Sequence, residues 1–150
     1  MSISKDELLK GRDKQYANEY SQEISDNLDK LLIPLNKVRD LYGIPMVVSS
    51  GWRPPSINAT TPGAAAHSAH CIGLAADIQD LDGKLKNWVL ENLPALSDLG
   101  FYFEDFRWTP NWVHFGLQRP ASGKRIFVPS AARPQAPDRW DGNYDHSLDN

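Results

Sequence analysis

Apolar residues recur at intervals of three and four between residues 19 and 42, which predicts an amphipathic helix. The apolar stripe consists of Ile24, Leu28, Leu31, Leu35, Val38 and Leu41. Pro34 lies within it, and because proline lacks a backbone N–H it should kink the helix or divide it. Gly43 is suited to end the helix. Near the N-terminus, Ser4 followed by Glu7 forms a capping-box pattern that predicts a short first helix.

Short apolar runs after this helix predict strands. The first runs from Met46 to Ser50, and the paired prolines that follow cannot continue a ladder. Further strand candidates are residues 74–78, 100–104, 112–117 and 125–128. Residues 84–93 have helical spacing, whereas 56–66 is rich in Pro, Gly and Ala and reads as a surface loop. Helices followed by strands, with one helix between them, predict the α+β class with a small antiparallel sheet.

The chain has 150 residues, which fits one domain. Beyond Pro129 the apolar content falls, and Pro, Arg, Asp and Gly dominate. We therefore expect one domain over residues 1–128 and a largely irregular tail over 129–150. Trp140 and Tyr144 are the residues in this tail that are able to anchor it.

Charge and composition exclude several classes of function. The formal net charge is −3 and the chain has no long basic run, which argues against nucleic-acid binding. The first residues hold no apolar core, so we expect synthesis as a soluble product without a signal peptide. The apolar runs are too short for membrane insertion, and a single cysteine, Cys71, excludes an internal disulfide. The sequence does not indicate an oligomeric state.

Three residues have the chemistry of a metal site. Catalytic zinc usually takes three protein ligands from His, Asp and Glu. His70 precedes a predicted strand that contains Asp77, and Gly73 between them lets the chain turn back. His114 comes from a separate strand. Spacing alone does not show that the three converge, and each could equally be a polar residue satisfied within the fold.

A family resemblance bears on this choice. The chain carries, in order, Ser-Gly-Trp-Arg-Pro at 50–54, Ser-x-His-x-x-Gly-x-Ala-x-Asp at 68–77 and Trp-x-His at 112–114. These patterns resemble the signature of a zinc peptidase family. It contains the D-alanyl-D-alanine carboxypeptidases and dipeptidases and the phage L-alanyl-D-glutamate endopeptidases, and it shares its fold with the hedgehog signalling domain. The resemblance spans about residues 47–117.

The resemblance implies a zinc ion held by His70, Asp77 and His114. Zinc polarises the scissile carbonyl and makes water a stronger nucleophile. A nearby carboxylate then takes the proton of the water and passes it to the leaving amine.

The position of that carboxylate departs from the family pattern. Many members carry Glu or Asp three residues before the last His, where this chain has Asn111, a neutral amide that cannot act as a base. The candidates are Glu104 and Asp105, at the end of the preceding predicted strand. We favour Glu104 because its side chain is longer. Asp105 would then be an exposed carboxylate at the strand end, where it could pair with Arg107.

Further residues are candidates for substrate contact. Arg53 is suited to stabilise negative charge on the carbonyl oxygen or to bind a substrate carboxylate, unless it is a surface arginine. Ser50 and Ser68 could support the site and its substrate, or be turn residues. Four aromatic residues could wall a substrate groove, although core packing explains most of them equally well: Trp52, Tyr102, Trp108 and Trp112.

Other polar residues near these motifs do not fit the pattern. His67 lies outside the motif spacing and reads as a loop residue, and His146 belongs to the tail. Cys71 has no second cysteine to support a thiolate metal site, so a buried structural thiol is the simpler interpretation.

The expected function is hydrolysis of amide bonds in peptidoglycan stem peptides by a zinc-dependent endopeptidase of the phage-lysin type, acting at the cell wall. A bacterial carboxypeptidase or dipeptidase that trims D-Ala-D-Ala ends is the first alternative. The second is a noncatalytic binding module or a structural part of a phage particle, which Asn111 keeps open.

Overall fold

The computed structural model describes residues 2–62, 64, 68–129 and 137–138. Within them, five strands form one sheet in the order β1-β2-β4-β3-β5. The strands are β1 (Val48–Ser50), β2 (Ala75–Gln79), β3 (Tyr102–Glu104), β4 (Trp112–Gly116) and β5 (Ile126–Phe127). The α+β class is confirmed. The sheet is not purely antiparallel, however, because β5 pairs parallel to β3. The chain reverses once between β4 and β5, and β3 is itself antiparallel to β4, so β5 runs in the direction of β3.

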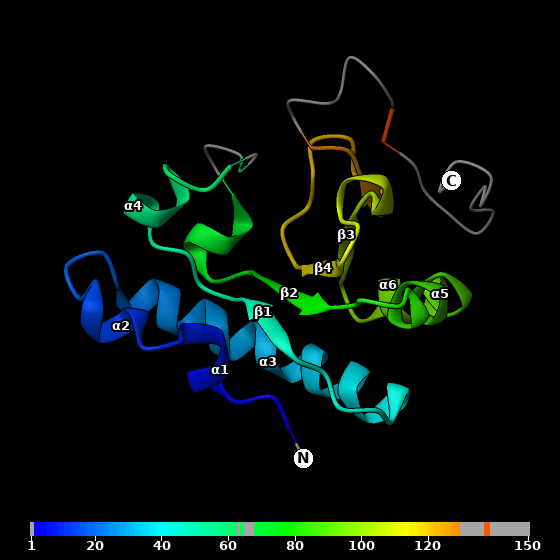
Figure 1. Cartoon of the computed structure of the whole chain (residues 1–150), viewed down its shortest axis with the longest axis horizontal. Helices are drawn as coiled ribbons and strands as arrows, with labels where there is room; N and C mark the ends of the chain where they lie inside the picture. Colours follow the sequence, from blue (N-terminus) through cyan, green and yellow to red (C-terminus); the bar gives the residue numbers. More distant parts are fainter. Residues whose placement is uncertain (1, 63, 65–67, 130–136, 139–150) are drawn as a thin grey trace.

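Most of the helices cover one face and one end of this sheet (Figure 1). They are α1 (Lys5–Leu9), α2 (Arg12–Gln15), α3 (Gln22–Tyr42), α4 (Pro55–Asn58), α5 (Lys84–Glu91) and α6 (Leu93–Asp98), with 3-10 turns η1 (Ala69–Ile72) and η2 (Phe106–Trp108). The predicted capping box is confirmed: the Ser4 hydroxyl accepts from the Glu7 amide, and the Glu7 side chain accepts from the Ser4 amide.

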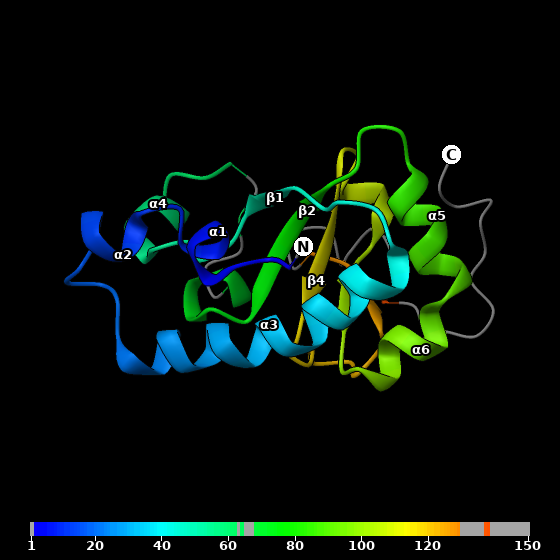
Figure 2. The same ribbon diagram turned by 90° about the horizontal axis from the view of Figure 1, so that it is seen from below.

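Helix α3 runs unbroken along the underside of β2 and β4 (Figure 2). The prediction that Pro34 might divide it is wrong. The proline costs about 3 kcal/mol in a helix interior, and burial of the apolar stripe against the core offsets that cost. The buried residues are Ile24, Leu28, Leu31, Leu35 and Val38. Leu41 was also placed in this stripe, but it is 63% exposed, so the buried face ends one turn earlier.

Three short helices, α2, α4 and α6, were not predicted. Helix α4 lies partly within the stretch 56–66 that had been read as loop. It begins at Pro55, whose fixed φ suits the first helical position. The predicted helix 84–93 ends at Glu91, and α6 follows immediately. Helices of four to six residues contain too few turns to give a recognisable apolar period.

The N-terminal helices fasten the segment that follows β1. The carbonyl of Leu8 accepts a hydrogen bond from the Trp52 amide at 2.8 Å, and Lys10 Nζ donates to the Val48 carbonyl at 2.8 Å. A Cβ at Gly51 would overlap the Leu8 backbone, so only glycine permits this approach. Trp52 is fully buried in the core and does not wall a groove.

The segment after β5 is attached through Asp138. Its carboxylate accepts from the Val128 amide at 2.8 Å and from the Ser122 hydroxyl at 2.6 Å. Trp140, Tyr144 and His146 lie outside the described residues. Among the helices that the structure describes, none is long and apolar enough to cross a membrane.

We expect Leu31→Ala to lower the free energy of unfolding by about 2–5 kcal/mol, because it opens a cavity beneath the sheet. Ile33→Ala, on the same helix but 64% exposed, should change it by at most about 0.5 kcal/mol. Urea denaturation measures both. Equal losses in the two variants would contradict the assignment of the buried face.

Candidate metal centre

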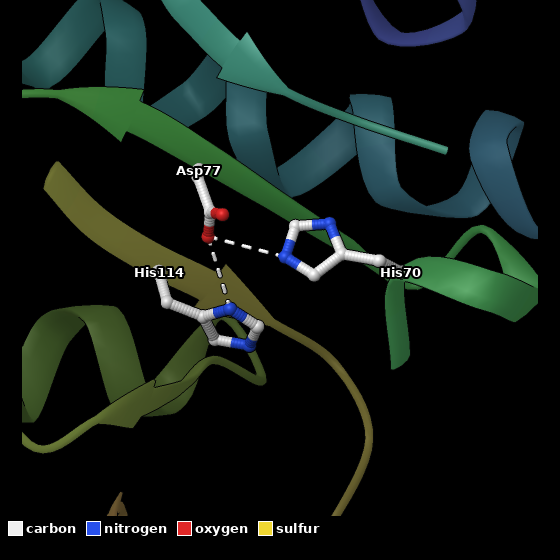
Figure 3. A group of neighbouring side chains, drawn as sticks. All are labelled: His70, Asp77 and His114. Atoms are coloured by element: carbon white, nitrogen blue, oxygen red, sulfur yellow. Dashed lines mark hydrogen bonds and ion pairs between the residues drawn. The ribbon is translucent and has the colours of Figure 1, made fainter. Parts of the chain in front are cut away.

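Strand pairing brings two of the predicted ligands together. In the antiparallel ladder of β2 and β4, Asp77 stands directly opposite His114. Ala76 and Ile78, on either side of Asp77, belong to the hydrophobic core beneath the sheet. Because side chains alternate along a strand, Asp77 projects from the face away from α3, toward His70 and His114 (Figure 3).

The third ligand candidate arrives on a tight turn. His70 lies in η1, where the Ser68 hydroxyl accepts a hydrogen bond from the His70 amide at 3.2 Å. Gly73 ends the turn with φ +81°, a conformation that other residues rarely adopt. A Cβ on Gly73 would also lie 2.9 Å from the Ile24 carbonyl oxygen. The turn therefore rests on α3 and directs His70 toward Asp77.

The three side chains meet at one point. His70 Nε2 lies 3.2 Å from Asp77 Oδ1, and His114 Nδ1 lies 3.1 Å from the same oxygen. Their possible ligand atoms all lie within 4.8 Å of one another. Sequence reasoning named the same three residues, and the structure brings them together.

The hydrogen bonds of His70 fit a bound cation. Its Nδ1 lies 2.8 Å from the Gly51 carbonyl oxygen, which can only accept, so Nδ1 carries the proton. Burial lowers the pKa of His70, so the ring is neutral and Nε2 presents a lone pair. That lone pair faces an oxygen of Asp77, another acceptor. Two acceptors directed at one point suit a metal ion, and a hydrogen bond from the other ring nitrogen to a carbonyl oxygen is typical of zinc-binding histidines.

The other two groups are strongly coupled. Burial alone would raise the pKa of Asp77, but the adjacent histidines outweigh it and hold this pKa well below its usual range. Burial would lower the pKa of His114, yet its hydrogen bond to Asp77 and the Asp77 charge raise it. Asp77 is therefore a carboxylate, the form that binds metal.

The ring of His114 is held from two sides. A Cβ on Gly116 would lie 3.0 Å from His114 Nε2, so the ring packs directly over this glycine. Phe127 meets the ring edge-on, with centroids 5.6 Å apart. Nδ1 is consequently the nitrogen that His114 turns toward Asp77.

Glu104, at the end of β3, is the second carboxylate near the cluster. Burial raises its pKa, and the charges of His114, Asp77 and Arg53 all act on it. A carboxylate with a raised pKa beside a metal site is typical of a general base.

Asp105 has a different environment. It is fully buried, with 0% exposure, and its carboxylate accepts hydrogen bonds from the Arg107 amide, Nε and Nη2 at 2.9–3.1 Å. The expected pairing with Arg107 is found, but the expected exposure is wrong. Three donors from one residue replace the water that a buried carboxylate would otherwise need. Asp105 therefore fastens the strand end, and Glu104 is the carboxylate on which the charges of His114 and Asp77 act.

Arg53 lies beside the cluster and is not a surface arginine. Its positive charge acts on His70, His114 and Glu104. Nη2 donates to the Ser68 hydroxyl at 3.4 Å, while its buried Nε has no hydrogen-bond partner among the described residues. A buried donor without a partner is costly, and a substrate oxygen would satisfy it.

The remaining candidates border the cluster. Ser50 stands opposite Asp77 in the β1–β2 ladder, and the Ser68 hydroxyl caps η1 and contacts Arg53. Trp112 begins β4, two residues before His114 and on the same face of the strand. Asn111 is exposed. Cys71 is not a member of the cluster that the described residues form, and burial raises the pKa of its thiol. His67 lies outside the described residues.

Sequence reasoning missed two glycines that shape the site. Gly51 supplies the carbonyl that orients His70, and Gly116 makes room for the ring of His114. Gly51 lies just before the Trp-Arg pair, and Gly116 lies two residues after His114. Nothing in the sequence says which backbone or ring approaches these glycines.

The fold and the cluster define an α+β domain with a His-Asp-His site of the type that binds a metal ion. The chain belongs to the peptidase M15 family, whose model matches residues 3–116. The resemblance noted from the motifs is confirmed, and the family consists of zinc peptidases. The matched region contains His70, Asp77, His114, Arg53 and Glu104. Comparison with curated proteins and with solved structures gave no match.

We expect the purified protein to bind about one zinc ion per chain, because three protein ligands form one such site. His70→Ala, Asp77→Ala and His114→Ala should each lose the metal, as measured by atomic emission after dialysis. Cys71→Ser, next to His70 but without a predicted metal contact, should keep it. Retention of zinc by all three ligand variants would contradict the assignment.

Proposed function

We propose that this peptidase is zinc-dependent and hydrolyses amide bonds in the stem peptides of peptidoglycan, as an endopeptidase of the phage-lysin type acting at the cell wall. The observation that carries the zinc assignment is the convergence of His70 Nε2, His114 Nδ1 and Asp77 Oδ1 beside Glu104 and Arg53. The wall substrate is supported by motifs that resemble those of D-alanyl-D-alanine and L-alanyl-D-glutamate peptidases.

Zinc would be held by His70, Asp77 and His114, where its Lewis acidity polarises a carbonyl and strengthens water as a nucleophile. Gly51 keeps His70 in the tautomer that leaves Nε2 free to bind. The chain thus prepares the ligand set with its own hydrogen bonds before a metal arrives.

Glu104 is the proposed general base. It accepts the proton that the attacking water loses and passes it to the departing amine nitrogen. The products are one new carboxylate and one new amine, so one water is consumed for each bond that is cut. Asn111 does not remove this function, because the carboxylate comes from the end of β3.

Arg53 is the proposed electrophilic partner. Its buried Nε, which lacks a partner among the described residues, is suited to donate to the carbonyl oxygen as negative charge develops there. Ser68 supports the guanidinium through Nη2. Ser50 and Trp112 border the cluster and are proposed to contact the peptide.

The first alternative is a carboxypeptidase or dipeptidase that trims D-Ala-D-Ala ends, for which Arg53 would bind the terminal carboxylate. The second is a module on the same fold that binds without cutting, or that serves as a structural part of a phage particle. A neutral residue at Asn111 favours the second, whereas the environment of Glu104 speaks against it.

We expect Glu104→Gln to fold, to bind zinc and to lose activity by about 10²–10⁴-fold, the usual contribution of a general base. Asp105→Asn should instead lower the free energy of unfolding by about 3 kcal/mol or more, because it disrupts a buried ion pair. Peptide hydrolysis and urea denaturation separate the two effects. Full activity in Glu104→Gln, with inactive but stable Asp105→Asn, would reverse the assignment.

Digestion of purified peptidoglycan by the zinc-loaded protein tests the substrate. We expect new amino and carboxyl termini within the stem peptides, identified by labelling and mass spectrometry. Release of free D-alanine without cleavage inside the stem would favour the carboxypeptidase. If zinc-loaded protein released nothing, the noncatalytic module would be the better assignment.

A further inference from the structure

A second arginine lies next to Arg53. Arg12 is the first residue of α2, and its Nη1 donates to the carbonyl oxygen of Trp52 at 2.9 Å. Trp52 directly precedes Arg53, and the two guanidinium charges interact: burial, and then the positive charge of Arg53, lower the pKa of Arg12. The contact between Arg12 and Trp52 joins positions 40 residues apart in the sequence. It brings the guanidinium groups of Arg12 and Arg53 to one short segment.

Neither cation forms a close ion pair in the part of the chain that the structure describes. The ion pairs found there involve other residues. A guanidinium carries five N–H donors, yet each of these two gives one hydrogen bond to a described residue. The buried Nε of Arg53 is among the donors left over.

Such a pair is unusual in this chain. The protein is acidic overall, with a formal net charge of −3, so the two arginines are not part of a generally basic surface. Like charges held together destabilise a fold, and an anion between them removes that cost. Arginine forks match carboxylates, which they can bind through two parallel hydrogen bonds.

We propose that Arg12 and the Nη1 group of Arg53 together bind a free carboxylate of the substrate, on a residue flanking the bond that is cut, while Nε of Arg53 serves the scissile carbonyl oxygen. The inference rests on the proposed peptidase function and adds a specificity residue to it. The Arg53 amide donates to the His70 carbonyl oxygen at 3.0 Å, and Nη2 donates to the Ser68 hydroxyl at 3.4 Å, which puts the bound carboxylate within reach of the metal cluster. The substrate class is therefore acidic peptides, and Arg12 selects them.

A merely structural role for Arg12 makes a different prediction. Its hydrogen bond to the Trp52 carbonyl could serve only to hold the segment before Arg53. In that case removal of Arg12 would impair every substrate equally, with or without a carboxylate.

The test compares two synthetic stem peptides, one with its free carboxylates and one with them amidated, on the full chain loaded with zinc. We expect Arg12→Gln to raise KM for the free peptide by about tenfold or more, in keeping with the loss of a charge-assisted hydrogen bond, and to change KM for the amidated peptide by less than twofold. Arg12→Lys, which keeps the charge, should recover part of the loss. Arg39→Gln, in the last turn of α3, is the matched control and should behave as wild type.

Equal losses on both peptides, or none on either, would overturn the proposal. If wild type hydrolysed neither peptide, the proposed function would fail, but carboxylate recognition would still be tested by isothermal titration of the same two peptides. Tighter binding of the free peptide, abolished in Arg12→Gln, would uphold the arginine pair. Equal affinity of wild type for both peptides would refute it.

Discussion

The site depends on the hydrogen bond between His70 Nδ1 and the Gly51 carbonyl oxygen. This bond selects the tautomer of His70, and it links the turn before β2 to the segment after β1. That segment is fixed in turn by the Leu8 carbonyl, which approaches so closely that Gly51 must lack a side chain. The N-terminal helices, which carry no ligand, thereby determine which nitrogen of His70 is offered to a metal.

Two neighbouring carboxylates, Glu104 and Asp105, have different roles because their environments differ. Asp105 is buried and accepts three hydrogen bonds from Arg107, so it stabilises the end of β3. Glu104, the last residue of β3, lies in the field of His114 and Arg53, and burial raises its pKa. Asp105 lies just beyond β3 as the N-cap of η2, so Arg107 can fix it while Glu104 remains available for a proton.

Much of the site could be predicted from sequence because its residues lie in short, spaced motifs. The three ligand candidates and Arg53 follow from such spacing and from family resemblance, and the preference for Glu104 follows from the length of its side chain. The role of Asp105, the unbroken path of α3 through Pro34 and the parallel pairing of β5 did not. Each depends on what packs against the element: Arg107 for Asp105, the core for α3 and the β3 edge for β5.

The sequence by itself determined the α+β class, the family and the residues able to bind metal, because apolar period and motif spacing are local properties of the chain. Only the tertiary structure decided which histidine nitrogens face Asp77, that Gly51 and Gly116 must be glycine, and that Arg12 lies beside Arg53. Several of these features join distant parts of the chain: Arg12 contacts Trp52, 40 positions away, and His114 contacts Asp77, 37 positions away. The spacing of residues in the sequence does not reveal these contacts, because they are set by how the helices and strands pack.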